Sequence, residues 1–464
     1  MQTRSSTLIF SLFLIFFIYQ SFAQQTPKWR RLPGAPFLSS SRIDDAWFIN
    51  PYVGWIANGL GQIWRTTNGG TTWLKQYDNR GVYFRSITFA DSIRGWACNL
   101  GTEEFGGATD TNIIFQTTNS GLTWFPNNNI SPRKPRGICG VQAIGDSFVY
   151  GVGRVRGPAF FIRSSDGGNT WQTRDMSGFV MGLLDVHFWT PDSGIICGHT
   201  GPVNESSSGR ILFTSDRGTT WRTLFTTSRI GEWCWKINFP SRRIGYVSLQ
   251  RNVGDTVNFL KTTDGGMTWQ EKRFRIPAYY VQGIGFATET RGWLGGNSSS
   301  PSYGTTDGGA TWFPDTIGLR MNRFRMLNDT IGYATGQGVY KYSISPVTGV
   351  SASTPTETPN SFVLLDVYPN PFNAQTTIEY TLTVGADDPA TPLYLRLKVY
   401  DALGREVAAL LDEPKRAGKY RLQFNGNNLA SGIYFLKLEA IKAYDNAPML
   451  KGNYVATKKL LLLR

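Results

Sequence analysis

An eight-residue pattern recurs six times between residues 66 and 312. It reads Ser or Thr, any residue, Asp or Asn, any residue, Gly, two further residues and Trp. The copies occupy residues 66–73, 117–124, 164–171, 214–221, 262–269 and 305–312, so that their closing tryptophans lie 43 to 51 residues apart. A repeat of this length, filled with short alternating strands, is typical of a β-propeller with four strands in each blade. The pattern therefore predicts an all-β ring.

The composition agrees with an all-β chain of more than one folded unit. Its 464 residues exceed what a single hydrophobic core usually holds. The sequence has 51 Gly, 15 Trp and 20 Tyr but only seven Met, which favours short strands and tight turns over long helices. With 41% hydrophobic and 17% charged residues, it is far from a disordered composition.

A second marker precedes each octet and sets the number of blades. It is an apolar residue followed six positions later by a small residue, as in Phe48 with Gly54 and Phe239 with Gly245. The marker occurs seven times, and its seventh unit has no octet. Residues 28–32 are similar to the segment that follows an octet, so we expect them to supply the outer strand of the seventh blade. This closure would leave no open sheet edge between the first and last blades.

The octets have a structural explanation that needs no ligand. Each Asp or Asn can accept backbone N–H bonds across a hairpin turn, and each Gly tolerates the positive φ that such turns require. The closing Trp can bury its ring beside the neighbouring sheet. The predicted acceptors are Asn68, Asn119, Asp166, Asp216, Asp264 and Asp307. We therefore predict a structural role for these six residues.

These octets resemble the Asp box of bacterial-neuraminidase-repeat propellers. Seven units with repeated Gly-Trp pairs are most similar to the photosystem II stability/assembly-factor-like members of that group. The resemblance covers about residues 29–344. It implies a seven-bladed propeller that binds protein through a basic face, although a photosystem partner does not follow from it.

The seven innermost strands should line a channel along the axis of the ring. The positions one and three before each marker are largely polar, whereas the residues between them are apolar, which predicts a polar channel wall. Two interpretations stay open, a ligand pocket or a water-filled channel with satisfied polar groups. The charged or titratable candidates are Asp45, Asp185, His187, Lys236, Arg323 and Arg325.

The chain begins with the features of a secretory signal peptide. An apolar run from Leu8 to Tyr19 is followed by Ser21-Phe22-Ala23, a cleavage-site pattern. The run is too short for a comfortable membrane span, and no later stretch approaches the required length. We expect residues 1–23 to be the signal peptide, and we expect no membrane-spanning segment.

A second domain is expected at the C-terminus. Residues 24–344 would form the propeller, and residues 345–360, rich in Pro, Ser and Thr, a linker. Alternating strands in residues 361–464 predict a small immunoglobulin-like β-sandwich.

Four motifs of this second domain resemble the type A C-terminal sorting domain of type IX secretion. They are residues 368–373, 399–407, 429–435 and 457–464. The resemblance implies that the secretion machinery is a partner. It also implies export through the periplasm to the outer-membrane surface or the medium.

The four cysteines permit disulfides in an exported chain. Cys98 and Cys197 stand where other blades place small residues, and Cys139 and Cys234 fall on opposite faces of their strands. Buried thiols are favoured, and one or more disulfides stay open.

No catalytic residue, cofactor or metal is predicted. The sequence has no phosphate-binding loop opening a helix and no paired-His metal motif. The formal net charge of +14 favours acidic partners without specifying one, and we expect no nucleic-acid partner. We predict an exported, non-enzymatic binding or assembly propeller with an unknown protein or glycan partner.

The alternative is a secreted glycan-active protein, either a sialidase-like glycoside hydrolase or a lectin. Residues 274–277 copy the Phe-Arg-Ile-Pro motif of sialidases, but they follow the fifth octet, whereas in sialidases the motif precedes the octets. Arg85, Arg323 and Arg325 could cluster around a carboxylate, yet no Tyr and Glu pair can be identified beside them.

Overall fold

The computed structural model describes residues 26–201, 206–254, 256–274, 279–296, 302–344, 361–384, 393–402, 404–416, 418–442 and 453–463. The predicted signal peptide (residues 1–23), the predicted linker (residues 345–360) and residues 275–277 of the sialidase-like motif lie outside these ranges. The chain divides into two compact units, Met1–Gly349 and Val350–Arg464.

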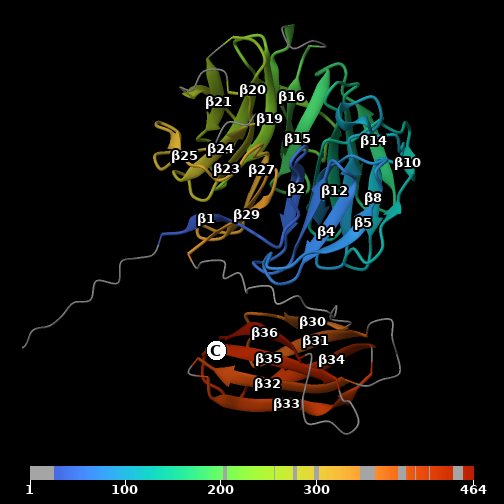
Figure 1. Ribbon diagram of the computed structural model, residues 1–464, viewed down its shortest axis with the longest axis vertical. Coiled ribbons are helices and arrows are strands. Elements are labelled where there is room, and N and C mark those ends of the chain that lie inside the picture. Colours follow the sequence, from blue (N-terminus) through green and yellow to red (C-terminus); the bar gives the residue numbers. More distant parts are fainter. Residues whose placement is uncertain are drawn as a thin grey trace, which may run out of the picture. The chain divides into compact units, whose positions relative to one another are not determined.

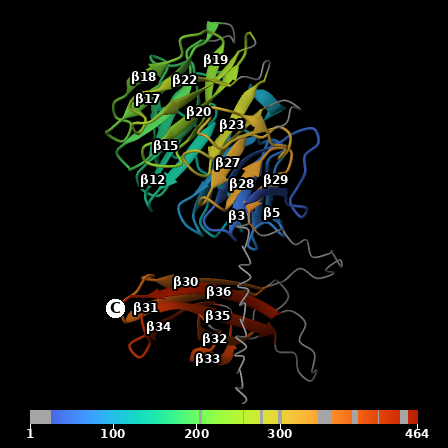
Figure 2. The same ribbon diagram turned by 90° about the vertical axis from the view of Figure 1, so that its left-hand side faces the viewer.

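Within the described residues, the first unit consists of seven sheets arranged as blades around an axis (Figures 1 and 2). Blade 1 holds β2 (Ile43–Phe48), β3 (Gly54–Asn58), β4 (Gln62–Thr66) and β5 (Leu74–Asp78). Blade 2 holds β6 (Phe84–Phe89), β7 (Gly95–Asn99), β8 (Ile114–Thr117) and β9 (Phe125–Pro126), with the 3-10 turn η1 (Phe105–Gly107) between β7 and β8. Blade 3 holds β11 (Gly140–Ile144), β12 (Phe148–Gly153), β13 (Phe160–Ser164) and β14 (Trp171–Asp175), and β10 (Ile130–Ser131) pairs in parallel with β14.

The remaining blades repeat this antiparallel order. Blade 4 holds β15 (Gly182–Phe188), β16 (Gly194–His199), β17 (Gly209–Thr214) and β18 (Arg222–Thr226). Blade 5 holds β19 (Glu232–Asn238), β20 (Gly245–Arg251), β21 (Val257–Thr262) and β22 (Gln270–Phe274), and blade 6 holds β23 (Val281–Phe286), β24 (Gly292–Gly296), β25 (Tyr303–Thr305) and β26 (Phe313–Pro314). Blade 7 holds β27 (Arg323–Met326), β28 (Gly332–Thr335), β29 (Val339–Ser343) and β1 (Lys28–Arg31).

The two ends of the propeller sequence close the ring. β1 pairs antiparallel with β29, with Lys28 opposite Ser343 and Arg31 opposite Tyr340, which confirms the predicted closing strand. Each innermost strand contacts that of the next blade, from β2 through β6, β11, β15, β19 and β23 to β27, which contacts β2. The ring is therefore continuous.

Hydrogen bonds within the octets hold all six hairpin turns. The predicted Asp or Asn accepts a bond from the backbone N–H four residues later, at 2.8 to 3.0 Å. The first Ser or Thr accepts another from the Gly N–H, also at 2.8 to 3.0 Å. These glycines have φ between 80° and 92°, a region costly for other residues. The turns therefore depend on the residues that the repeat specifies.

The small residue of the second marker gives an aromatic ring room to cross its own sheet. Gly54 stands opposite Phe48, and a Cβ at Gly54 would lie 2.2 Å from the Phe48 ring. The ring covers the glycine and stacks on Tyr333 of blade 7, with the ring centroids 3.4 Å apart. The marker thus lets an aromatic ring of one blade pack against an aromatic ring of the adjacent blade.

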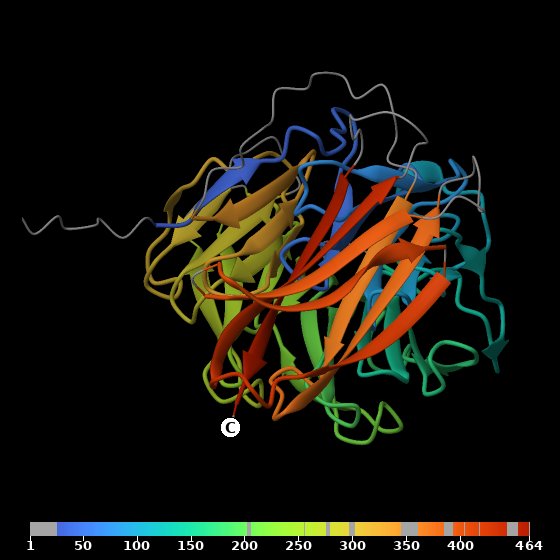
Figure 3. The ribbon, with the colours of Figure 1, turned by 90° about the horizontal axis from the view of Figure 1, so that it is seen from below.

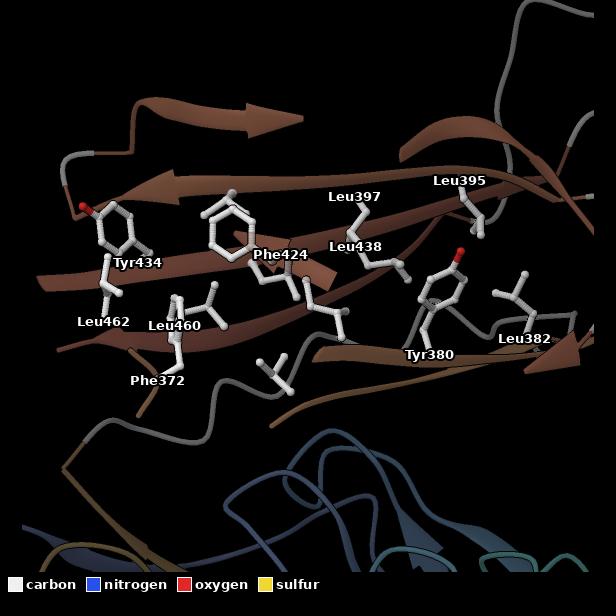
Figure 4. Close-up of a cluster of buried hydrophobic side chains, with 14 residues drawn as sticks. Phe372, Tyr380, Leu382, Leu395, Leu397, Phe424, Tyr434, Leu438, Leu460 and Leu462 are labelled. Carbon is white, nitrogen blue, oxygen red and sulfur yellow. The ribbon is translucent and has the colours of Figure 1, made fainter. Parts of the chain in front are cut away.

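The described residues of the second unit form two antiparallel sheets, shown in orange to red in Figure 3. One contains β30 (Ser361–Tyr368), β31 (Gln375–Val384) and β34 (Gly418–Asn425). The other contains β33 (Glu406–Lys415), β32 (Leu393–Asp401), β35 (Gly432–Lys442) and β36 (Asn453–Leu462). Buried side chains from both sheets, among them Tyr380, Phe424 and Leu438, form a single core (Figure 4). The all-β prediction of a seven-bladed propeller followed by an immunoglobulin-like β-sandwich is confirmed.

All four cysteines lie in the described part of the propeller, three of them in strands and Cys139 directly before β11. Cys98, Cys139, Cys197 and Cys234 are free and buried. Of the two alternatives that the sequence left open, the structure has the buried thiols.

Candidate functional site

Five of the six predicted channel residues meet in one group of ion pairs. Arg323 of β27 binds both carboxylate oxygens of Asp185 on β15, at 3.0 and 3.1 Å, and its Nε lies 2.9 Å from Asp45 on β2. Arg325 contacts Asp45 at 3.5 Å, and Lys236 of β19 contacts Asp185 at 3.8 Å. We call Asp45, Asp185, Lys236, Arg323 and Arg325 the axial ion cluster. Because β15 and β27 belong to blades 4 and 7, it joins strands from opposite sides of the ring.

The axial ion cluster is almost entirely removed from solvent. The exposed fraction is 6% or less for four of its side chains and 27% for Arg325. Burial opposes ionisation of Asp185, but the charges of Arg323 and Lys236 outweigh it and hold the pKa of Asp185 well below its usual range. Asp45 and Asp185 also accept backbone N–H bonds from Ile87 and Ile237, each on the following blade. The two carboxylates therefore bind backbone groups of the neighbouring blade as well as Arg323 of blade 7.

A second ion pair, between Asp44 and Arg85, was not among the predicted channel residues. The guanidinium of Arg85 binds the carboxylate of Asp44, and Arg42 binds the same oxygen at 2.8 Å. Both Asp44 and Arg85 are buried because β-bulges shift the register of β2 after Ile43 and of β6 after Phe84. The alternation of positions one and three before each marker therefore did not include Arg85 and Asp44.

Aromatic side chains fill the axis next to these ion pairs. The guanidinium of Arg85 lies 5.4 Å from the indole of Trp235. The Nε1 of Trp235 donates a hydrogen bond to the side chain of Asn322 on blade 7, at 3.3 Å. Trp233 stacks parallel to Trp235 and also on His199. Leu100, Cys139, Val155 and Leu184 of blades 2, 3 and 4 belong to the same buried cluster. Around Trp233 and Trp235 the axis of the ring is therefore filled by apolar side chains.

His187, the sixth predicted channel residue, lies among aromatic rings instead of ion pairs. Its imidazole stacks on Phe239 at 4.9 Å and meets the edge of Trp189 at 5.4 Å. Burial lowers the pKa of His187 to about 4, so the ring is neutral at pH 7. His187 therefore packs against aromatic rings, although the charges of Asp185 and Arg325 still act on it.

A pocket of about 480 Å³ opens between blades 4 and 5, and none of the predicted channel residues lines it. It is lined by Trp189 and Ser193 from the loop after β15, and by Arg242 and Arg243 from the loop after β19. Asp264 and Met267 of the fifth octet complete it. No sequence pattern indicates this pocket, because its residues lie in three separate loops.

The described part of the chain holds no group of three or more His, Cys, Asp or Glu side chains arranged for a metal ion. None of its helices has the length and apolar character needed to cross a membrane.

Lys236 makes a testable contribution to pH dependence. Burial, and secondly the charge of Arg323, lowers the pKa of Lys236 to about 8, whereas the unfolded chain keeps a lysine protonated to about pH 10.4. Between these values the unfolded state binds a proton that the folded state has released, so the Lys236 contribution to the free energy of unfolding rises with pH. In Lys236→Met this contribution should be absent. Urea denaturation of both proteins between pH 7.5 and 10.5 measures it, and parallel curves would contradict the prediction.

Comparison with known proteins identifies the C-terminal unit. Residues 366–446 match the family described as the secretion system C-terminal sorting domain. This match indicates export by type IX secretion to the cell surface or the medium. Among curated proteins, none matches the chain.

Solved structures resemble the propeller in fold alone. YCF48 from Cyanidioschyzon merolae aligns with a TM-score of 0.52 and 16% identity, over 68% of this chain and 99% of that chain. A structure of YCF48 bound to D1 peptide has a TM-score of 0.49 and 17% identity, over 69% and 96%. A GH74 xyloglucanase from Xanthomonas campestris has a TM-score of 0.47 and 11% identity, over 89% and 80%. The chain therefore joins a seven-bladed β-propeller, of the fold seen in YCF48, to a C-terminal unit that carries a secretion system sorting domain.

Proposed function

We propose that this protein is an exported, non-enzymatic binding module, whose propeller engages a partner at the cell surface or in the medium. Residues 1–23 would direct it to the periplasm, and the type IX machinery would carry it outward by recognising the C-terminal unit. The propeller would then be the part that acts at the destination.

The observation that carries the non-enzymatic part of this proposal is the mutual pairing of the axial charges. A sialidase-like hydrolase needs arginines free to clamp a substrate carboxylate and a carboxyl group free to transfer a proton. Here Arg323 is bound to Asp185 and Asp45, and Arg85 is bound to Asp44. These groups are buried and form ion pairs with one another. The arrangement supports a structural role for the axis, and it favours partner binding at the outer surface of the propeller.

The test is a combined assay of turnover and binding by the purified full-length chain. Fluorogenic glycosides report hydrolysis, and a glycan array together with candidate envelope proteins reports binding. We expect saturable binding without turnover. Turnover that is lost in Arg325→Ala, the most exposed member of the axial ion cluster, would overturn the proposal in favour of a glycoside hydrolase.

A further inference from the structure

The pocket between blades 4 and 5 contains residues that the propeller fold does not require. The repeat provides the comparison, because the other six blades form the same loops with other residues. The position of Trp189, one after the marker, is held elsewhere by Ile49, Ala90, Ile144, Pro240, Ala287 and Leu327. The position of Arg242, three after the marker, is held by Pro51, Ser92, Asp146, Pro191, Glu289 and Asp329. Trp189 and Arg242 are therefore additions to the repeat, and they face each other in one pocket.

The pocket presents positive charge on an aromatic wall. The exposed guanidinium of Arg242 lies over the indole of Trp189 at 5.0 Å, and no ion pair to Arg242 occurs among the described residues. Arg243 is also exposed, and its Nε donates to the carbonyl of Thr263 at 2.8 Å. The buried Nε1 of Trp189 has no hydrogen-bond partner in the described structure. The two arginines keep several further N–H donors that a ligand could use.

The carboxylate that lines the pocket, that of Asp264, accepts hydrogen bonds within its own hairpin turn. Asp264 accepts bonds from the backbone of Met267 and Thr268, both at 3.0 Å, and from the Thr268 hydroxyl at 2.6 Å. These bonds outweigh the effect of burial and lower the pKa of Asp264 to about 2. Asp264 therefore stays ionised, and two arginines face one carboxylate whose acceptors are occupied. The balance favours an anionic ligand.

We propose that this pocket binds a carboxylated sugar residue of an acidic polysaccharide. A volume of about 480 Å³ falls within the range of small-ligand pockets and admits a whole sugar ring. The paired guanidinium groups suit a carboxylate, which arginine binds through two parallel N–H bonds. The Met267 side chain offers apolar contact to the carbon face of the ring, and Ser193 offers a hydroxyl. The Trp189 indole holds the guanidinium of Arg242 in the pocket. An acidic side chain of a peptide would use the arginines but leave Met267 and much of the volume without contact.

This inference deepens the proposed function, because it names the ligand class and the place where the propeller binds it. The site lies on the side of the ring that carries the octet turns, and the axial ion cluster takes no part in it. Substitutions in the pocket can thus test binding there without changing the axial ion cluster.

The test is calorimetric titration of the full-length chain with short oligouronates, namely galacturonate, guluronate and hyaluronan fragments. Maltotriose serves as the neutral sugar and a glutamate-rich peptide as the acidic non-sugar. We expect an oligouronate to bind and maltotriose not to bind. We also expect its affinity to fall about tenfold or more in Arg242→Gln, which loses a charge-assisted contact, and to weaken as salt is added.

The matched control is Arg133→Gln. Arg133 also lies over an aromatic ring, that of Phe160 at 5.5 Å, but on blade 3. It should leave affinity unchanged, whereas Trp189→Ala should lose it, with circular dichroism confirming that each variant is folded. Absence of oligouronate binding, tighter binding of the peptide, or equal affinities in Arg242→Gln and wild type would overturn the inference. None of these outcomes depends on glycoside turnover, which tests the proposed function separately.

Discussion

Arg323→Ala is expected to lower the free energy of unfolding of the propeller by about 3–5 kcal/mol. The substitution removes a side chain that binds both Asp45 of blade 1 and Asp185 of blade 4. Both carboxylates are buried, so each would be left with weaker compensation at 3.5 Å or more, from Arg325 or Lys236. Leaving a buried charge uncompensated costs far more than losing a contact at the surface.

Guanidinium chloride denaturation followed by tryptophan fluorescence measures this effect. Arg217→Ala is the control, because Arg217 forms an exposed ion pair with Asp192 at 2.6 Å. Exposed pairs contribute little, so this variant should unfold close to the wild type. Similar shifts for both variants would mean that the axial ion cluster does not hold the ring together.

Leu32→Ala should be the second most damaging change, costing about 2–5 kcal/mol. Leu32 follows the closing strand β1 and is fully buried. It packs in one cluster with Phe48 and Ile56 of blade 1 and with Tyr333 and Val339 of blade 7. A cavity at this position would weaken the junction where the two ends of the propeller sequence meet.

Leu74→Ala provides a control with the same chemical change. Leu74 lies on the outer strand β5 with 48% of its side chain exposed, so little apolar contact is lost there. Thermal unfolding should show a large decrease in Tm for Leu32→Ala and a small one for Leu74→Ala. If the two decreases are equal, the closing segment is not a critical junction.

Much of the fold could be predicted because its determinants are local in sequence. An octet contains the acceptor, the donor and the glycine of its own turn within eight residues, as in Thr66, Asn68 and Gly70. A marker glycine likewise meets its ring six residues away, and the number of such units sets the number of blades. Closure by residues 28–32 followed because the last unit lacked one strand and a ring leaves no other place for it.

The candidate sites were determined by tertiary structure. The sequence indicated that Asp45, Asp185, Lys236, Arg323 and Arg325 face the axis, but Arg323 and Asp185 are 138 residues apart, and no local pattern pairs them. Bulges in β2 and β6 turned Asp44 and Arg85 inward against the alternation. The pocket of Trp189 and Arg242 arises only where loops of two blades meet. Turn geometry is fixed by neighbours along the chain, whereas burial, charge pairing and pocket shape depend on which distant residues the closed ring brings into contact.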